Sequence, residues 1–215
     1  MEDDLEDWHA WERYTQHRWV FNKLELSLKL GYTAGPVPLP VPATGEYVVR
    51  PIYNLSGMGA GAKIVTLNAN EAYDYAPGYF WCERFVGDHL SVNYKWQNNC
   101  LVETHTSIGE SDPKNLSKFR RWCKIENQNI PLPQWINEFN DVEDINIEFI
   151  DGNIIEIHLR KGSYFPDGAT ELIPVWATTK QTEILHYRGM GYKFHDYYID
   201  AEKNISDPLL GFLYK

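Results

Sequence analysis

The segment Ile145–Arg160 constrains the fold most strongly, because its pattern fits two adjacent β-strands joined by a tight turn. It reads INIEFIDGNIIEIHLR, with β-branched residues on both sides of an Asp-Gly pair that favours a hairpin. In the second strand, side chains two residues apart share a face. The apolar face consists of Ile155, Ile157 and Leu159. The polar face consists of Glu156, His158 and Arg160, in which an acid and an imidazole can bind a cation and the arginine can reach a phosphate.

Whether Glu148 joins the polar face depends on the length of the turn. A two-residue turn, Asp151-Gly152, pairs Glu148 with Ile155 and points its carboxylate to the other side of the sheet. A three-residue turn, Asp151–Asn153, pairs Glu148 with Glu156, and the two carboxylates repel each other unless a cation or a proton lies between them. The three-residue register therefore predicts a metal site, and the other register predicts an exposed sheet face with ion pairs.

A glycine-rich loop lies between two further strand-like segments, Glu46–Leu55 and Ala62–Leu67. The loop, Ser56–Gly61, reads SGMGAG and places a glycine at every second position. Its backbone amides can approach phosphate oxygens without hindrance from a Cβ atom. A dinucleotide-binding fingerprint would require a helix after the glycines, whereas AKIVTL indicates a strand. We therefore expect either a flap over a nucleotide or a hairpin turn without a ligand.

Charge and composition exclude several classes of protein. The 215 residues carry 20 basic and 30 acidic side chains, so we expect no broad binding to nucleic-acid backbones. The basic run Lys114–Lys124, with Lys118, Arg120, Arg121 and Lys124, could hold an anionic substrate or form a solvated helix face. No segment approaches the roughly 20 apolar residues of a membrane span. Residues 1–7 are acidic, unlike a secretory signal, and are expected to form a frayed tail of a cytoplasmic protein.

Periodicity predicts mainly strands after an N-terminal helical region. Helical spacing covers Trp8–Leu30 and ends at Gly31, and further helix-like segments are expected at 113–123 and 132–140. Four prolines in Ala34–Thr44 favour a stiff connector over a strand. Two more strands are expected at Phe80–Phe85 and Leu90–Trp96.

The two motifs, in this order and separation, resemble the ATP-grasp superfamily of carboxylate–amine or carboxylate–thiol ligases. The resemblance covers residues 20–178 in patches. Asn22–Pro38 is similar to a helix with an initial lysine and a short proline-containing strand, and Tyr47–Pro51 to the strand with a phosphate-binding cation. Tyr79–Tyr94 resembles the hinge between two lobes, and Ile145–Arg160 the metal-binding strands. The resemblance implies an α+β fold in which two α+β lobes with antiparallel sheets clasp a nucleotide.

The resemblance also implies roles for individual residues. The nucleotide-binding residues that it implies are Lys23, Arg50, Ser56, Gly57, Gly59, Gly61, Glu83, Arg84, Phe85 and Val86. The implied magnesium ligands are Glu148 and Glu156, together with His158 if this histidine is itself a ligand. Arg160 and Arg50 are implied as catalytic residues, and the Arg160 guanidinium would stabilise charge on the transferred phosphoryl group.

Three departures make the chain a minimal, divergent member of the resembled family. His158 stands where the family usually has asparagine, so it either binds metal or weakens one metal site. His89 stands where a second acid of the hinge is common, which affects ribose recognition. About twenty residues precede Asn22, where the family usually has a substrate-binding domain, so substrate recognition is expected from loops of this chain or from a protein partner.

The function that the resemblance implies is ATP-dependent ligation with Mg²⁺. A small-molecule or peptide carboxylate would be activated as an acylphosphate and joined to an amine or a similar nucleophile. The expected regions are a tail and leading helix (1–18), an N-terminal lobe (19–83) and a C-terminal lobe (84–215), with the loop after Arg160 next to the substrate. The alternatives are a binding module with weak or no turnover and a phosphotransferase that uses the same cleft.

Overall fold

The computed structural model describes residues 6–55, 59–112, 115–162, 165–196 and 207–215, apart from the side chain of residue 117. Within these residues the chain forms two antiparallel sheets and a few short helices, which confirms the expected α+β class. The helical elements are α1 (Asp7–Arg13), the 3₁₀ helix η1 (Thr15–Phe21), α2 (Lys23–Lys29), the 3₁₀ helix η2 (Gln134–Phe139) and α3 (Gln181–Gly189). None of the helices in the described part of the chain is both long and apolar enough to cross a membrane.

The smaller sheet has four strands in the order β1-β4-β2-β3. Its strands are β1 (Ala34–Pro36), β2 (Gly45–Pro51), β3 (Lys63–Leu67) and β4 (Tyr79–Glu83). The larger sheet has eight strands in the order β11-β12-β10-β7-β6-β5-β8-β9. Its strands are β5 (His89–Gln97), β6 (Cys100–Asp112), β7 (Asn115–Ile125), β8 (Asp144–Ile150), β9 (Asn153–His158), β10 (Glu171–Trp176), β11 (Lys193–Asp196) and β12 (Leu209–Tyr214).

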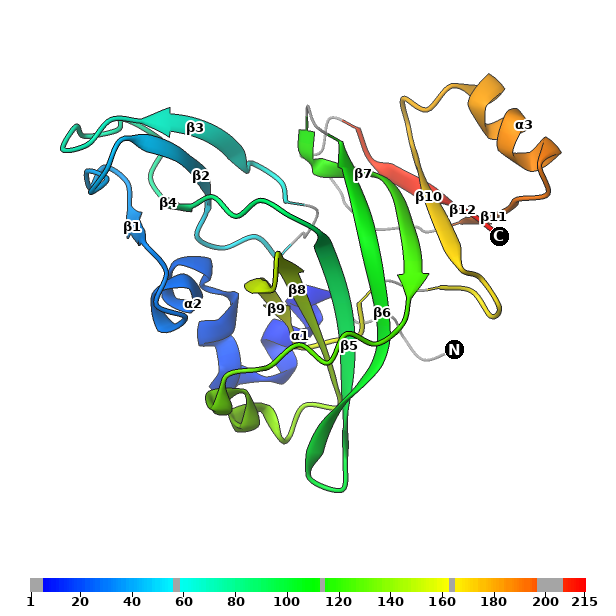
Figure 1. Ribbon diagram of the computed structural model, residues 1–215, viewed down its shortest axis with the longest axis horizontal. Helices are drawn as coiled ribbons and strands as arrows, with labels where there is room; N and C mark the ends of the chain where they lie inside the picture. The colour runs from blue at the N-terminus through cyan, green and yellow to red at the C-terminus, as the bar shows by residue number, and fades with distance from the viewer. Residues whose placement is uncertain (1–5, 56–58, 113–114, 163–164, 197–206) are drawn as a thin grey trace.

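The N-terminal helices pack at the β8–β9 end of the larger sheet, and α2 also contacts β1 and β4 of the smaller sheet (Figure 1). Alternation along β8 turns one face of this strand to the helices, and the core there contains Ile145, Ile147 and Phe149 together with Val20, Phe21 and Leu26. Each such side chain stabilises the fold by about 1.5–3 kcal/mol when it is fully buried. The packing therefore leaves the opposite face of β8 for the space between the sheets.

The smaller sheet likewise has one apolar face and one face that is open to the space between the sheets. Tyr47, Val49 and Trp81 form a second buried cluster on the first face. Val48 and Arg50 alternate with them on β2 and therefore point to the other face, toward the larger sheet. Period-two alternation in both sheets thus produces two polar faces that look at each other.

Two expected elements are wrong. The segment expected as a helix at 113–123 is part of strand β7 from Asn115 onward, and residues 113 and 114 lie outside the described residues. In this strand Arg121 pairs with Glu110 of β6 and Glu171 of β10. Contacts between strands outweigh the local helical spacing there, since strand propensity depends on neighbours across the sheet. The proline-rich connector at 34–44 begins with the short strand β1, which includes Pro36. It pairs with β4 at the edge of the sheet, where a proline needs no partner for its missing N–H.

The other elements are confirmed in outline. The helical region Trp8–Leu30 is divided into α1, η1 and α2, and it ends at Gly31, whose φ of 80° is in the left-handed region. The helix-like segment at 132–140 contains the 3₁₀ helix η2. The strands expected on both sides of the glycine-rich loop are β2 and β3, which pair with each other.

Candidate functional site

A cavity of about 430 Å³ lies between the two sheets. Most of the side chains singled out from the sequence line it: Lys23, Arg50, Gly59, Glu83, Arg84, Phe85, Val86, Glu148, Glu156, His158 and Arg160. Gly61 is not among the lining residues, although its neighbours Ala60 and Ala62 are. Ser56 and Gly57 lie outside the described residues. The fold therefore brings together side chains from α2, both sheets and the segment that joins β4 to β5.

A β-bulge brings the two glutamates to one face of the β8–β9 hairpin. The turn has two residues, because Ile150 pairs with Asn153, and its φ angles of 50° at Asp151 and 75° at Gly152 fit a type I′ turn. The register then shifts between Glu148 and Phe149, so that Glu148 pairs with Glu156. The structure combines features of the two expected registers. The turn has two residues, as in the first register, but Glu148 pairs with Glu156, as in the second. An extra residue in the second strand, Ile155, reconciles them.

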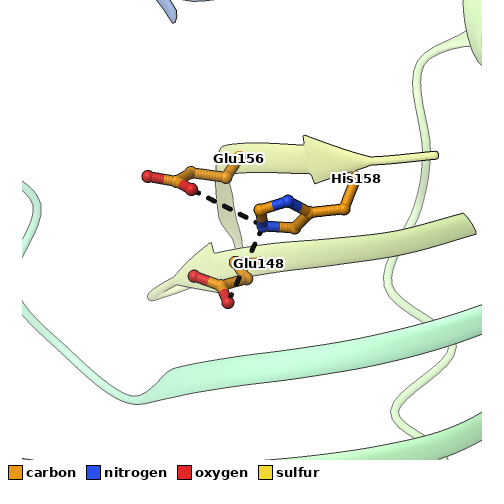
Figure 2. A group of neighbouring side chains, drawn as sticks. All are labelled: Glu148, Glu156 and His158. Atoms are coloured by element: carbon orange, nitrogen blue, oxygen red, sulfur yellow. Dashed lines mark ion pairs between the residues drawn. The ribbon is translucent and has the colours of Figure 1, made fainter. Parts of the chain in front are cut away.

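The three side chains expected to hold a metal converge (Figure 2). His158 Nε2 lies 3.5 Å from Glu156 Oε2 and 4.0 Å from Glu148 Oε1. One ligand atom from each residue lies within 4.8 Å of the other two. His158 is buried, and the side chain of Glu156 is 12% exposed. Two carboxylates and an imidazole at such separations are a donor set that fits a divalent cation.

Cations of the protein surround the glutamates. Lys23 Nζ and Arg50 Nη1 both contact Glu156 Oε1, the latter at 3.2 Å, and Arg50 Nη2 donates to the Ile155 carbonyl at 3.1 Å. His89 Nε2 lies 3.2 Å from Glu148 Oε2. These contacts bring basic groups from α2, β2 and β5 to the two acids of β8 and β9.

The same contacts keep both glutamates ionised. Burial raises the pKa of Glu148, but His89 and His158 outweigh it and lower this pKa to about 2. Burial also raises the pKa of Glu156, and Lys23 and Arg50 lower it below its ordinary value against the opposing charge of Glu148. The site therefore holds two adjacent negative charges at neutral pH.

Asp7 is the residue of this site that sequence reasoning missed. It was expected in a frayed tail, yet it begins α1, is 2% exposed and contacts His158 Nδ1 at 2.8 and 2.9 Å. Arg160 Nε donates to Asp7 Oδ1 at 2.7 Å. Burial lowers the pKa of His158, but the Asp7 carboxylate raises it above its ordinary value. The expectation of a solvated tail is therefore wrong at Asp7, because hydrogen bonds to the His158 imidazole and the Arg160 guanidinium offset the cost of burying its carboxylate.

Solved structures of other proteins are similar to this fold. No family model and no curated protein matches this sequence. The similar solved structures include a carboxyaminoimidazole ribonucleotide synthase from Aspergillus clavatus complexed with ATP, an N5-carboxyaminoimidazole synthetase from Staphylococcus aureus complexed with ADP, and an L-amino acid ligase from Bacillus licheniformis. The TM-scores are 0.58, 0.55 and 0.54, and the sequence identities 11%, 11% and 10%.

The similarity extends over nearly the whole chain. It covers 96%, 94% and 94% of this chain, which spans 73%, 68% and 68% of the three others in the same order. The chain has the ATP-grasp fold. The cavity of this ATP-grasp fold is the space between the two sheets, where the two glutamates and the cations described above meet.

The segment that joins the two sheets of the ATP-grasp fold supplies another part of the cavity wall. Glu83 Oε1 accepts a hydrogen bond from the backbone N–H of Thr33 at 2.8 Å, and Arg84 forms an ion pair with Glu46. The Phe85 ring packs edge-on against Tyr32, with 4.8 Å between the ring centres. Val86 lines the cavity and is 69% exposed, so its surface is open to a ligand.

Aromatic residues of the larger sheet complete the wall, and sequence reasoning missed them. The rings of Phe119 and Trp122 on β7 line the cavity and lie 4.9 and 5.6 Å from the His89 ring. Phe212 of β12 also lines it. The expected helix at 113–123 hid this arrangement, because only a strand in the order β7-β6-β5 brings the rings of Phe119 and Trp122 across β6 to His89 of β5. The backbone after Arg160 lines the cavity with Lys161 and Gly162, and residues 163 and 164 lie outside the described part.

The basic run on β7 is engaged by acids within the ATP-grasp fold. Lys118 forms an ion pair with Asp207, and Arg121 with Glu110 and Glu171. Arg120 lies 3.9 Å from Glu110. These pairs offset the charge of Lys118, Arg120 and Arg121, which was considered for an anionic substrate. The run therefore stabilises contacts between strands rather than forming the solvated face of a helix.

Proposed function

We propose that this protein is an ATP-dependent ligase that activates a carboxylate as an acylphosphate and joins it to an amine or a similar nucleophile. The observation that carries the proposal is the convergence of Glu148 and Glu156 opposite Lys23 and Arg50 in the cavity of an ATP-grasp fold. Adjacent carboxylates can hold the cation of a nucleotide, and basic side chains facing them can hold its phosphates. Three similar structures support the proposal, since one is complexed with ATP, one with ADP, and one is a ligase of amino acids.

The residues present fit both Mg²⁺–ATP and its phosphates. The fit of the metal is carried by the donor set of Glu148, Glu156 and His158. The fit of the phosphates is supported by Arg50 Nε, a buried donor that has no hydrogen-bond partner within the described structure. A buried donor of this kind costs free energy unless an acceptor reaches it, and a phosphate oxygen is such an acceptor. When bound, the metal would offset charge on the phosphate oxygens as the γ-phosphoryl moves.

The chain's own residues would act by position and charge. Lys23 and Arg50 would bind phosphate oxygens, and Arg160 would stabilise the charge of the moving phosphoryl group. A carboxylate oxygen of the substrate would attack the γ-phosphorus and release ADP, and the amine would then displace phosphate and lose a proton to water. Catalysis of this kind needs no side-chain nucleophile. It agrees with Cys82, the cysteine in the cavity, whose pKa burial raises and whose thiol is therefore a poor nucleophile.

The remaining residues singled out from the sequence would bind the base and the ribose or form the glycine-rich flap. We place the base beside Arg84, Phe85 and Val86, with Glu83 near the base and the ribose. The flap would cover the phosphates with the backbone of Ser56, Gly57, Gly59 and Gly61. Small-molecule or peptide carboxylates and amines would enter beside the backbone after Arg160. A protein partner that supplies substrate recognition also belongs to this proposal.

A thermal-shift titration with ATP and Mg²⁺ tests nucleotide binding. A ligand at 100 times its dissociation constant stabilises the folded state by about 2.7 kcal/mol, which raises the melting temperature by roughly 5–10 °C in a protein of this size. Glu156→Gln should abolish the part of the shift that depends on Mg²⁺. Asp141→Asn, which changes an acid that pairs with His17 and is not among the cavity-lining residues, is the control. A wild-type protein without a shift at millimolar ATP contradicts the proposal.

A binding module without turnover is the second candidate, and one observation favours it. The Arg160 guanidinium, which should reach the phosphoryl group, is held by the buried carboxylate of Asp7. Release of ADP in the presence of panels of carboxylates and amines separates the two candidates. A nucleotide-dependent thermal shift without ADP release supports the binding module. Analysis of the product by mass spectrometry then distinguishes a ligase, which forms an amide-type bond, from a phosphotransferase, which leaves a phosphorylated product.

A further inference from the structure

Glu156 divides its two oxygens between different partners. Oε1 is contacted by Lys23 Nζ and by Arg50 Nη1, the latter at 3.2 Å. Oε2 lies 3.5 Å from His158 Nε2 instead. Lys23 and Arg50 therefore hold Oε1, the outer oxygen, and Oε2, the inner oxygen, faces the imidazole.

Glu148 shows the same division on the neighbouring strand. Its Oε2 lies 3.2 Å from His89 Nε2, and its Oε1 lies 4.0 Å from His158 Nε2. The inner oxygens of Glu148 and Glu156 and the Nε2 atom of His158 therefore face one point, while each outer oxygen is held from behind. Figure 2 shows this convergence on the imidazole.

Asp7 determines which ring nitrogen of His158 faces the glutamates. Its carboxylate accepts from His158 Nδ1 with both oxygens, at 2.8 and 2.9 Å. An Nδ1–H donor bound in this way leaves Nε2 as the nitrogen that can bind a metal. Arg160 holds Asp7 from the other side through Nε, at 2.7 Å. Asp7 is thus fixed by two partners, and the imidazole ring has one orientation.

The donor set differs from one made of oxygens alone. Mg²⁺ prefers oxygen ligands, whereas an imidazole nitrogen favours first-row transition ions, with affinity rising from Mn²⁺ to Co²⁺. Ligands that share one octahedral ion at about 2.1 Å lie about 3 Å apart. The separations of 3.5 and 4.0 Å from His158 Nε2 therefore need to shorten by about 0.5 to 1 Å, and the three ligand atoms all lie within 4.8 Å of one another, so side-chain rotation can bring them to one ion.

We propose that Asp7 positions His158 as a nitrogen ligand, and that this ligand shifts the metal preference of the site from Mg²⁺ toward a first-row transition ion such as Mn²⁺ or Co²⁺. The inference rests on the proposed function, because it concerns the metal that would accompany ATP. It adds a specificity-determining residue, His158, and a positioning residue, Asp7, which lies 151 positions away in the sequence.

Pulsed electron paramagnetic resonance of the protein with Mn²⁺ tests the ligand directly. An imidazole nitrogen bound to Mn²⁺ produces a ¹⁴N modulation of the signal, and we expect it in the wild-type protein. His158→Asn, which places an amide where the imidazole was, should remove the modulation. Asp7→Asn should weaken it, because the ring loses the charged acceptor that orients it. Asp141→Asn should leave it unchanged, since it alters a similar acid–histidine pair, at 2.7 Å from His17, that does not line the cavity.

Metal affinities measured by calorimetry provide the second readout. We expect His158→Asn to weaken Co²⁺ binding at least 10-fold and Mg²⁺ binding less than about 3-fold, and Asp7→Asn to weaken Co²⁺ binding about 10-fold. Circular dichroism of each variant shows whether it is folded, and His158→Asn tests the proposal if Asp7→Asn does not fold. Mn²⁺ bound without ¹⁴N modulation in the wild-type protein overturns this inference and leaves the proposed ligase intact. A wild-type protein that binds no divalent cation, with or without ATP, overturns both.

Discussion

Lys23 and Glu156 form a buried ion pair that joins α2 to β9, although 133 residues separate them in the sequence. The side chains are 9% and 12% exposed, so water screens their charges little. Arg50 from the smaller sheet contacts the same carboxylate oxygen. Glu156 is therefore the point at which the N-terminal helices, the smaller sheet and the larger sheet meet.

Removal of the Glu156 charge should lower the free energy of unfolding, independently of any effect on catalysis. Glu156→Gln leaves Lys23 and Arg50 as buried cations without their acid, which costs about 2–4 kcal/mol in the free energy of unfolding. Lys23→Met combined with Glu156→Gln should cost less than the sum of the two single changes, because Lys23 is then no longer left as a buried cation without its acid. Urea denaturation of the four proteins measures this coupling. Strict additivity would show that the pair contributes nothing.

Two glycines in this part of the fold should respond differently to alanine. Gly152 in the β8–β9 turn has a φ of 75°, and the space that an added methyl group would occupy is open, so Gly152→Ala should cost about 1 kcal/mol through backbone strain alone. A Cβ atom at Gly162 would lie 2.2 Å from Asn146 Nδ2, which donates to Ser91 and Asn93. Gly162→Ala should therefore cost about 2–3 kcal/mol. Urea denaturation checks the order, and an equal loss at both sites contradicts the packing argument.

Local patterns predicted much of the fold because period-two alternation is visible in the sequence wherever a sheet has one buried face. The hairpin around Asp151 and Gly152, the strands β2 and β3 and the strand β4 follow from such patterns. The bulge at Ile155 did not, because turn length alone sets the register only when both strands are regular. The carboxylates could therefore be identified as candidates, but their pairing could not be decided.

Asp7 and strand β7 show what local patterns lack. Nothing near Asp7 distinguishes it from the other acids at the N-terminus, and its burial depends on His158 and Arg160, which α1 meets only after packing on the larger sheet. The strand β7 depends in the same way on acids of β6 and β10, such as Glu110, that pair with its cations. The burial of Asp7 and the strand conformation of β7 both depend on contacts between residues far apart in the sequence. Local sequence patterns do not reveal such contacts.

The free energy of unfolding should fall in mild acid because of His105. Burial, together with the charges of Lys124 and Lys161, lowers the pKa of its imidazole to about 4, and Nε2 is buried without a hydrogen-bond partner in the described structure. The unfolded chain takes up this proton near pH 6.5 and the folded protein only near pH 4. Stability from the neutral imidazole is therefore present above pH 6.5 and is lost as the pH falls toward 4.

A variant without this imidazole isolates the effect. His105→Phe keeps an aromatic ring beside Phe165, whose ring centre lies 4.8 Å from that of His105, and removes the titrating group. Between pH 7 and pH 5 the wild-type protein should lose about 1 kcal/mol more stability than the variant. Guanidinium denaturation at both pH values measures the difference. Equal losses in the two proteins would show that His105 takes up its proton in the folded state as readily as in the unfolded one.

Arg50 should matter for nucleotide binding through the shape of its guanidinium as well as its charge. Nη1 contacts Glu156, Nη2 donates to the Ile155 carbonyl at 3.1 Å, and Nε remains as a buried donor for a phosphate oxygen. A lysine keeps the charge and cannot make these contacts at once. Arg50→Lys should therefore weaken ATP binding about 10-fold, which corresponds to about 1.4 kcal/mol. Arg121→Lys on the exposed side of β7 is the matched control, and an ATP affinity lowered equally by both changes would point to general electrostatics in place of a specific phosphate contact.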